Sequence, residues 1–196
     1  MTAPSSLDRV WTVPNLLSAA RFVLSIVFFV AVERGLHWPA LWLFLIAAST
    51  DWIDGWWARR FQQVSRLGRI FDPLVDKVIV CGGFILLAAR DGSSAILPWM
   101  AVVVVVRELV VTAMRAEMER VGRDFSAGPA GKLKMVLQCA AIAIELFARC
   151  RPDVAFGEVG VREIASGVAW AAVAATVYSG VEYLVAAARM LTSPGK

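Results

Sequence analysis

Four aspartates lie between two apolar stretches in residues 41–89, which read LWLFLIAASTDWIDGWWARRFQQVSRLGRIFDPLVDKVIVCGGFILLAA. Asp51 and Asp54 are spaced i,i+3, whereas Asp72 and Asp76 are spaced i,i+4. Residues at either spacing share one face of an α-helix. Because the connection between the two apolar stretches is short, we predict antiparallel neighbouring helices with all four carboxylates at one end of the pair.

The composition is too apolar for a soluble domain. Of the 196 residues, 59% are hydrophobic and 18% are charged, and the mean hydropathy is +0.66. Soluble domains are roughly 45–50% apolar and about 25% charged. The composition therefore indicates an integral membrane protein, and it excludes a soluble enzyme with a single anchor as well as intrinsic disorder. At roughly 20 residues per membrane-crossing helix, the length accommodates about six spans.

Six apolar segments are visible in the sequence. We therefore predict a single all-α integral membrane domain over residues 1–196, with six transmembrane helices. The predicted spans are 14–32, 37–57, 73–89, 95–115, 131–148 and 165–188. Ionisable residues interrupt most of these spans. Because a charge at the bilayer centre costs at least roughly 2.5–3.5 kcal/mol, these residues are candidates for function.

The Lys and Arg residues between the spans determine the predicted orientation. With a cytoplasmic N-terminus, twelve of them fall on the cytoplasmic side and five on the opposite side, which agrees with the positive-inside rule. We therefore predict a multi-pass protein of the inner membrane with both termini in the cytoplasm. The aspartates then lie at the cytoplasmic end of the bundle. The basic residues are distributed among the loops, so we expect no nucleic-acid partner.

The aspartates predict a divalent-metal site. Four neighbouring carboxylates cannot all stay ionised without compensation, and oxygen ligands select Mg²⁺ or Mn²⁺. Four carboxylates are enough for two ions, and paired metals stabilise phosphoryl oxygens during in-line displacement. Gly55 and Gly68 would let a phosphate approach the backbone closely, and Arg59 is placed to meet its charge. We therefore expect a phosphoryl-transfer site.

A simpler interpretation of these aspartates requires no metal. Asp72 precedes Pro73 and would serve as a helix N-cap. Asp51 and Asp54 would then be polar residues at the end of a span. This interpretation accounts for single aspartates but leaves the combined spacing of the aspartates, glycines and arginine unexplained.

The spacing resembles a known signature. The string is Asp51-x2-Asp54-Gly55-x2-Ala58-Arg59-x8-Gly68-x3-Asp72-x3-Asp76, and it matches every fixed position of the motif of the CDP-alcohol phosphatidyltransferases. The resemblance implies a membrane enzyme, usually a homodimer, that transfers a phosphatidyl group from CDP-diacylglycerol to an alcohol and releases CMP.

The resemblance also implies roles for individual residues. The metal ligands would be Asp51, Asp54, Asp72 and Asp76, and Asp76 would also act as the catalytic general base. The CDP-diacylglycerol site would be lined by Gly55, Ala58, Arg59 and Gly68.

Three further segments resemble family members whose acceptor is glycerol 3-phosphate. These segments are residues 14–21, Arg107-Glu108-x6-Arg115, and Gly131-Lys132-Leu133-Lys134. The acceptor is a dianion, and a cationic pocket would match it. We therefore expect four residues to bind the acceptor phosphate: Arg107, Arg115, Lys132 and Lys134. Arg107 and Arg115 are eight residues apart, which places them on one helix face.

Other interpretations stay open at this point. Arg107 and Glu108 could form an ion pair that only supports packing, and the other basic residues could be ordinary cytoplasmic-side charges. The acceptor could be another alcohol, such as phosphatidylglycerol or an inositol phosphate. A cation transporter is a more distant alternative, in which the carboxylates would line a conduction path.

Overall fold

The structure is a computed structural model that describes residues 13–61, 66–90, 94–120 and 128–192. The side chains of 51–61, 66–73 and 76 lie outside this description, although the backbone there is helical. The chain divides into two compact units, Met1–Leu86 and Leu87–Lys196. Each unit is described separately.

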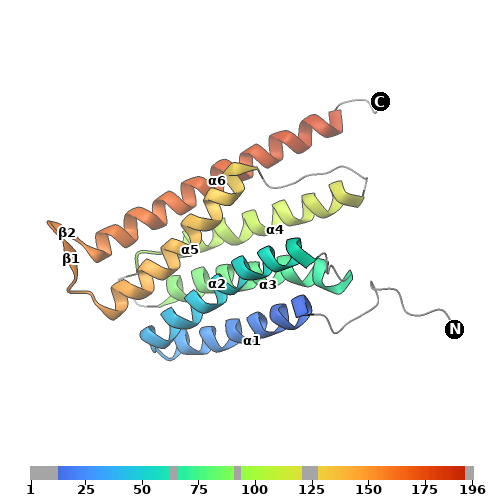
Figure 1. The fold of residues 1–196 in the computed structure, drawn as a ribbon. Helices are drawn as coiled ribbons and strands as arrows, with labels where there is room; N and C mark the ends of the chain where they lie inside the picture. Colours follow the sequence, from blue (N-terminus) through green and yellow to red (C-terminus); the bar gives the residue numbers. More distant parts are fainter. Residues whose placement is uncertain (1–12, 62–65, 91–93, 121–127, 193–196) are drawn as a thin grey trace. The chain divides into compact units, whose positions relative to one another are not determined.

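Six α-helices make up most of the described chain (Figure 1). They are α1 (Val13–Glu33), α2 (His37–Phe61), α3 (Arg66–Ala89), α4 (Pro98–Arg120), α5 (Pro129–Cys150) and α6 (Val161–Thr192). Each predicted apolar segment coincides with one helix, so the predicted helical fold is confirmed. A small hairpin of β1 (Ala155–Phe156) and β2 (Val159–Gly160) lies between α5 and α6.

One helix boundary differs clearly from the prediction. The third span was predicted from Pro73 onward, but α3 already begins at Arg66. Pro73 therefore lies inside the helix, where its ring removes one backbone hydrogen bond. Asp72 is not at a helix start, so N-capping does not explain it.

By length and composition, one described helix is apolar enough to cross a membrane. It is the Val161–Arg189 part of α6, which has 29 residues. A shorter apolar helical stretch covers Lys77–Ala89.

In the first unit, α1 packs against α2. The turn between them is a Schellman motif, in which Gly35 has a φ of 73°. Leu36 N–H donates to the Ala31 carbonyl at 2.9 Å and Gly35 N–H to the Val32 carbonyl at 2.9 Å. Glycine adopts this left-handed conformation without strain, so Gly35 ends α1 and lets the chain reverse.

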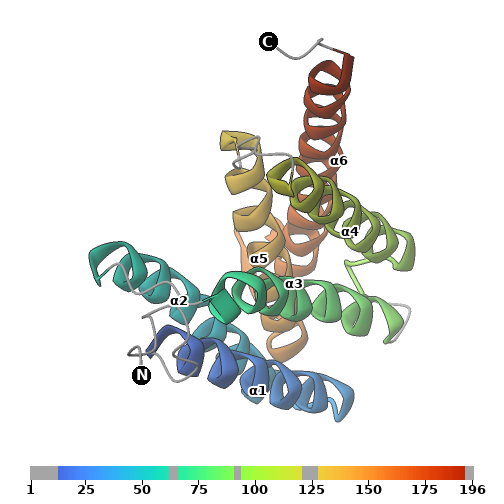
Figure 2. The ribbon, with the colours of Figure 1, turned by 90° about the vertical axis from the view of Figure 1, so that its right-hand side faces the viewer.

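The core of the first unit joins all three of its helices. Phe28 of α1 and Phe44 of α2 are fully buried, with ring centroids 5.6 Å apart. On α3, a Cβ at Gly82 would lie 2.3 Å from Cζ of Phe29. The absence of a side chain at Gly82 therefore lets the Phe29 ring lie directly on α3. Figures 1 and 2 show α2 and α3 running in opposite directions, as predicted.

In the second unit, α6 packs against both α4 and α5. Small residues at helical spacing, Ala165, Ala169 and Ala172, are buried on α6. Such residues allow close approach between helices. Thr176 continues this face, and its hydroxyl accepts a hydrogen bond from the Gln138 amide of α5 at 2.9 Å. This buried polar contact fixes the register of α5 on α6.

Candidate active site

The predicted metal and nucleotide residues lie on two helices of the first unit. Five of them are on α2, namely Asp51, Asp54, Gly55, Ala58 and Arg59. Gly68, Asp72 and Asp76 are on α3. Both segments are helical, as the spacing argument requires, so each aspartate pair shares a helix face. The side chains of all these residues lie outside the described residues, and their assigned roles stay predictions.

Among the described residues, no group of three or more His, Cys, Asp or Glu side chains could hold a metal. The side chains of the four aspartates are not among these described residues. The donor set itself fits a hard divalent cation, since it consists of carboxylate oxygens. The helical backbone of α2 and α3 is compatible with that assignment.

The second unit contains a buried cluster of charges on α4, α5 and α6. Arg107 of α4 lies 3.3 Å from Glu108 through Nη1 and Oε1. Its Nη2 donates a hydrogen bond to Ser179 Oγ on α6 at 3.0 Å. The same guanidinium carbon lies 5.5 Å from the ring centroid of Tyr183. Arg107 is thus held from two sides, with 10% of its side chain exposed.

Lys134 of α5 joins this cluster from the opposite side. Its Nζ donates to the same Glu108 Oε1 that contacts Arg107. Glu108 and Lys134 are each 6% exposed. Among the described residues, one carboxylate therefore contacts two largely buried cations.

Two of the four predicted acceptor residues are therefore brought together, and Glu108 is the residue that joins them. Arg115 lies two turns beyond Arg107 on α4, and its buried Nε has no hydrogen-bond partner among the described residues. Lys132 is exposed. Because Lys132 and Lys134 are two residues apart, they point to nearly opposite sides of α5.

Gly180 makes room for this cluster. A Cβ at Gly180 of α6 would lie 3.2 Å from Cγ of Arg107. The sequence assigned no role to Gly180, and for Glu108 it offered only an ion pair with Arg107 that supports packing; this ion pair is present. The one available signal was the Arg107-Glu108 pair itself, because adjacent charges within an apolar helix require buried partners.

Comparison with known proteins identifies the class to which this site belongs. Residues 11–178 match the family model described as CDP-alcohol phosphatidyltransferase. The chain therefore belongs to the CDP-alcohol phosphatidyltransferase family. This result confirms the resemblance of the aspartate motif, and it identifies the chain as an enzyme of that class rather than a cation transporter.

Individual relatives match over most of the chain. The Bacillus subtilis protein named CDP-diacylglycerol–glycerol-3-phosphate 3-phosphatidyltransferase is 31% identical over 188 residues, which cover 88% of this chain and 93% of that protein. The Escherichia coli K12 protein of the same name is 33% identical over 187 residues, covering 90% and 95%.

A solved structure has the same fold. It is the Mycobacterium tuberculosis phosphatidylinositol phosphate synthase with CDP-DAG bound. The TM-score is 0.64 at 20% identity, and the match covers 96% of this chain and 92% of that chain.

Proposed function

We propose that this protein transfers the phosphatidyl group of CDP-diacylglycerol to glycerol 3-phosphate and thereby forms phosphatidylglycerophosphate and CMP. The observation that carries the proposal is the shared name of relatives that match about nine-tenths of the chain at 31–33% identity. The two basic side chains that meet at Glu108, Arg107 and Lys134, support an anionic acceptor.

The reaction assigns a task to each group of residues. The acceptor hydroxyl oxygen attacks the phosphorus of the phosphatidyl group, and the bond from this phosphorus to the CMP oxygen breaks. Asp76 takes the proton of the attacking hydroxyl as general base. Gly55, Ala58, Arg59 and Gly68 line the CDP-diacylglycerol site.

A divalent-metal requirement is part of the proposal. Asp51, Asp54, Asp72 and Asp76 would hold two Mg²⁺ or Mn²⁺ ions. When bound there, the ions neutralise the pyrophosphate and stabilise the charge on departing CMP. The carboxylates in turn lose the mutual repulsion that they would otherwise have.

The acceptor phosphate would be bound by the basic residues of the second unit. Arg107 offers its guanidinium in an orientation fixed by Ser179 and Tyr183. Lys134 supplies a second charge, and Arg115 supplies a buried Nε that still lacks a partner in the described chain. Lys132 would act from the exposed side of α5 and help to attract the dianion.

We also propose the cellular setting. The chain would form one domain and cross the inner membrane six times, with both termini in the cytoplasm. It would act as a homodimer, as the family resemblance implies. The apolar composition and the asymmetry of Lys and Arg support this arrangement.

The test is release of CMP by the purified full-length protein in detergent, with CDP-diacylglycerol, Mg²⁺ and one acceptor at a time. We expect release with glycerol 3-phosphate and at least tenfold less with inositol phosphate or phosphatidylglycerol. Release with only one of the other alcohols would overturn the acceptor assignment while leaving the family chemistry intact.

A further inference from the structure

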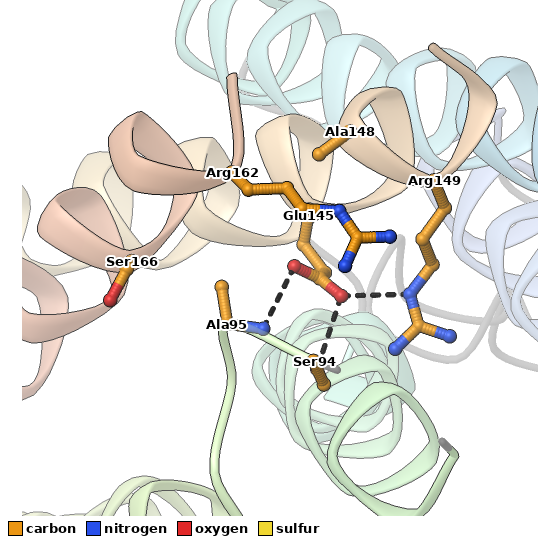
Figure 3. A pocket seen from close by; sticks show the side chains of 7 residues that line it. All are labelled: Ser94, Ala95, Glu145, Ala148, Arg149, Arg162 and Ser166. Carbon is orange, nitrogen blue, oxygen red and sulfur yellow. Dashed lines mark hydrogen bonds and ion pairs between the residues drawn. The ribbon is translucent and has the colours of Figure 1, made fainter. Parts of the chain in front are cut away.

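A second polar site lies in the second unit, away from the Arg107 cluster. It is a pocket of about 220 Å³ between the segment before α4, the last turns of α5 and the first turns of α6 (Figure 3). Its polar lining residues are Ser94, Glu145, Arg149, Arg162 and Ser166. No step of the proposed reaction uses this pocket.

Glu145 is fully occupied by protein groups. Its carboxylate accepts hydrogen bonds from Arg149 Nε at 2.7 Å, Ser94 Oγ at 3.1 Å and the Ala95 backbone N–H at 3.2 Å. Arg149 also donates through Nη2 to the Leu87 carbonyl at 2.9 Å. Glu145 and Arg149 therefore neutralise each other within a rigid wall of the pocket.

The third charged side chain of the lining, Arg162, takes no part in this hydrogen-bond network. Figure 3 shows its guanidinium extending from the first turn of α6 into the pocket, toward the side on which Arg149 lies. Within the described residues, Arg162 makes no hydrogen bond or ion pair. The lining thus carries one positive charge that has no partner among the described residues, on a side chain that is exposed.

The surroundings of the pocket indicate a membrane interface. Trp170, one turn beyond Ser166, packs on Trp99 of α4 with ring centroids 5.2 Å apart. The two rings are 53% and 43% exposed. Phe156 of the adjoining hairpin is also exposed. Exposed tryptophans are typical of the level at which lipid headgroups lie.

We propose that this pocket binds the phosphate group of a phospholipid headgroup. Arginine pairs with phosphate through a planar fork of N–H donors, and Arg162 offers such a fork at the pocket. The pocket volume of about 220 Å³ is smaller than the roughly 300–1,000 Å³ of pockets that bind drug-sized ligands. It is large enough for a phosphate with part of a headgroup. In the predicted orientation, this site faces the leaflet opposite the cytoplasm.

The test measures lipid binding by the full-length protein in neutral detergent. Native mass spectrometry follows the binding of added phosphatidylglycerol to the wild type and to Arg162→Gln. We expect the variant to bind at least about tenfold more weakly, because it loses charge-assisted hydrogen bonds. The matched control is Arg151→Gln, whose side chain is exposed and paired with Asp153 outside the pocket; it should bind like the wild type.

A second variant tests the pocket without changing charge. Ser166→Leu places a larger side chain in the lining of the pocket and should weaken lipid binding to a similar extent. Both variants should keep CMP release within about twofold of the wild type, which shows that they are folded. The proposal fails if both folded variants bind the lipid as the wild type does, or if Arg151→Gln loses as much binding as Arg162→Gln.

Inorganic phosphate distinguishes a lipid headgroup from a free anion. If millimolar phosphate leaves lipid binding unchanged, the occupant is the lipid. If phosphate displaces the lipid from the wild type, the pocket takes a phosphate group from either source. Both results support the site, and they differ only in its occupant.

Discussion

At the scale of single residues, the buried charge of Glu108 has the widest consequences. Its Oε1 contacts both Arg107 and Lys134, so removing the negative charge would take a carboxylate partner from each of two largely buried cations. Loss of one partner of a buried ion pair typically costs about 3–5 kcal/mol. The carboxylate therefore supports the fold, and at the same time it positions two of the proposed acceptor ligands.

We predict that Glu108→Gln lowers the free energy of unfolding by about 3 kcal/mol and raises the KM for glycerol 3-phosphate at least about tenfold. The KM for CDP-diacylglycerol should change little. Glu117→Gln is the control, since Glu117 lies on the same helix and pairs with Arg120 at an exposed position. Equal increases in both KM values would restrict Glu108 to a structural role.

A second prediction concerns the proposed general base. Asp76→Asn should lower the rate of CMP release by at least about 100-fold, because the amide cannot accept the hydroxyl proton. The helical content measured by circular dichroism should stay unchanged. Asp153→Asn, at an exposed loop carboxylate, should retain full activity. Normal CMP release by folded Asp76→Asn would exclude this residue as the base.

At the scale of elements, the sequence predicted the six helices, because local patterns of apolar residues determine where helices lie. Apolar runs located all six helices, because burial of apolar side chains depends mainly on composition and period. The α3 helix begins before the predicted third span, because its first turns contain the charged residues Arg66, Arg69 and Asp72, which an apolar run leaves out. The β1–β2 hairpin was not predicted, because strands of two residues are too short for an alternating pattern.

The contacts of Glu108 and Glu145 could not be derived from local sequence. Glu108 meets Lys134 across 26 positions and Glu145 meets Ser94 across 51. Such partners depend on how α4, α5 and the segment before α4 pack. The aspartate motif, in contrast, was recognisable from the sequence, because all of its residues lie on two consecutive helices at fixed spacings.

Close packing at Gly82 supplies a prediction about helix contacts. Gly82→Ala places a Cβ 2.3 Å from the Phe29 ring, so we expect a loss of about 1–3 kcal/mol in unfolding free energy. Gly167→Ala is the matched control, since no atom lies within 4 Å of its added Cβ. This control should be neutral or stabilising by up to about 1 kcal/mol. Equal effects of both substitutions would contradict the contact between α1 and α3.

At the scale of the whole molecule, the proposed site draws carboxylates from two helices, so metal removal should affect activity and stability together. Excess EDTA should stop CMP release, and added Mg²⁺ or Mn²⁺ should restore it. Mg²⁺ should also raise the thermal midpoint of the wild type but not that of Asp72→Asn. Activity that persists in excess chelator would refute the metal site.

The predicted membrane orientation also concerns the whole chain. In a variant whose native cysteines are replaced, a membrane-impermeant maleimide applied to intact cells should label Glu158→Cys, in the hairpin turn. It should label Glu117→Cys, in the last turns of α4, only after lysis. Both positions are exposed, so a difference in labelling reports the side of the membrane rather than burial. The reverse pattern would place the termini outside, and the proposed active site would then lie away from cytoplasmic glycerol 3-phosphate.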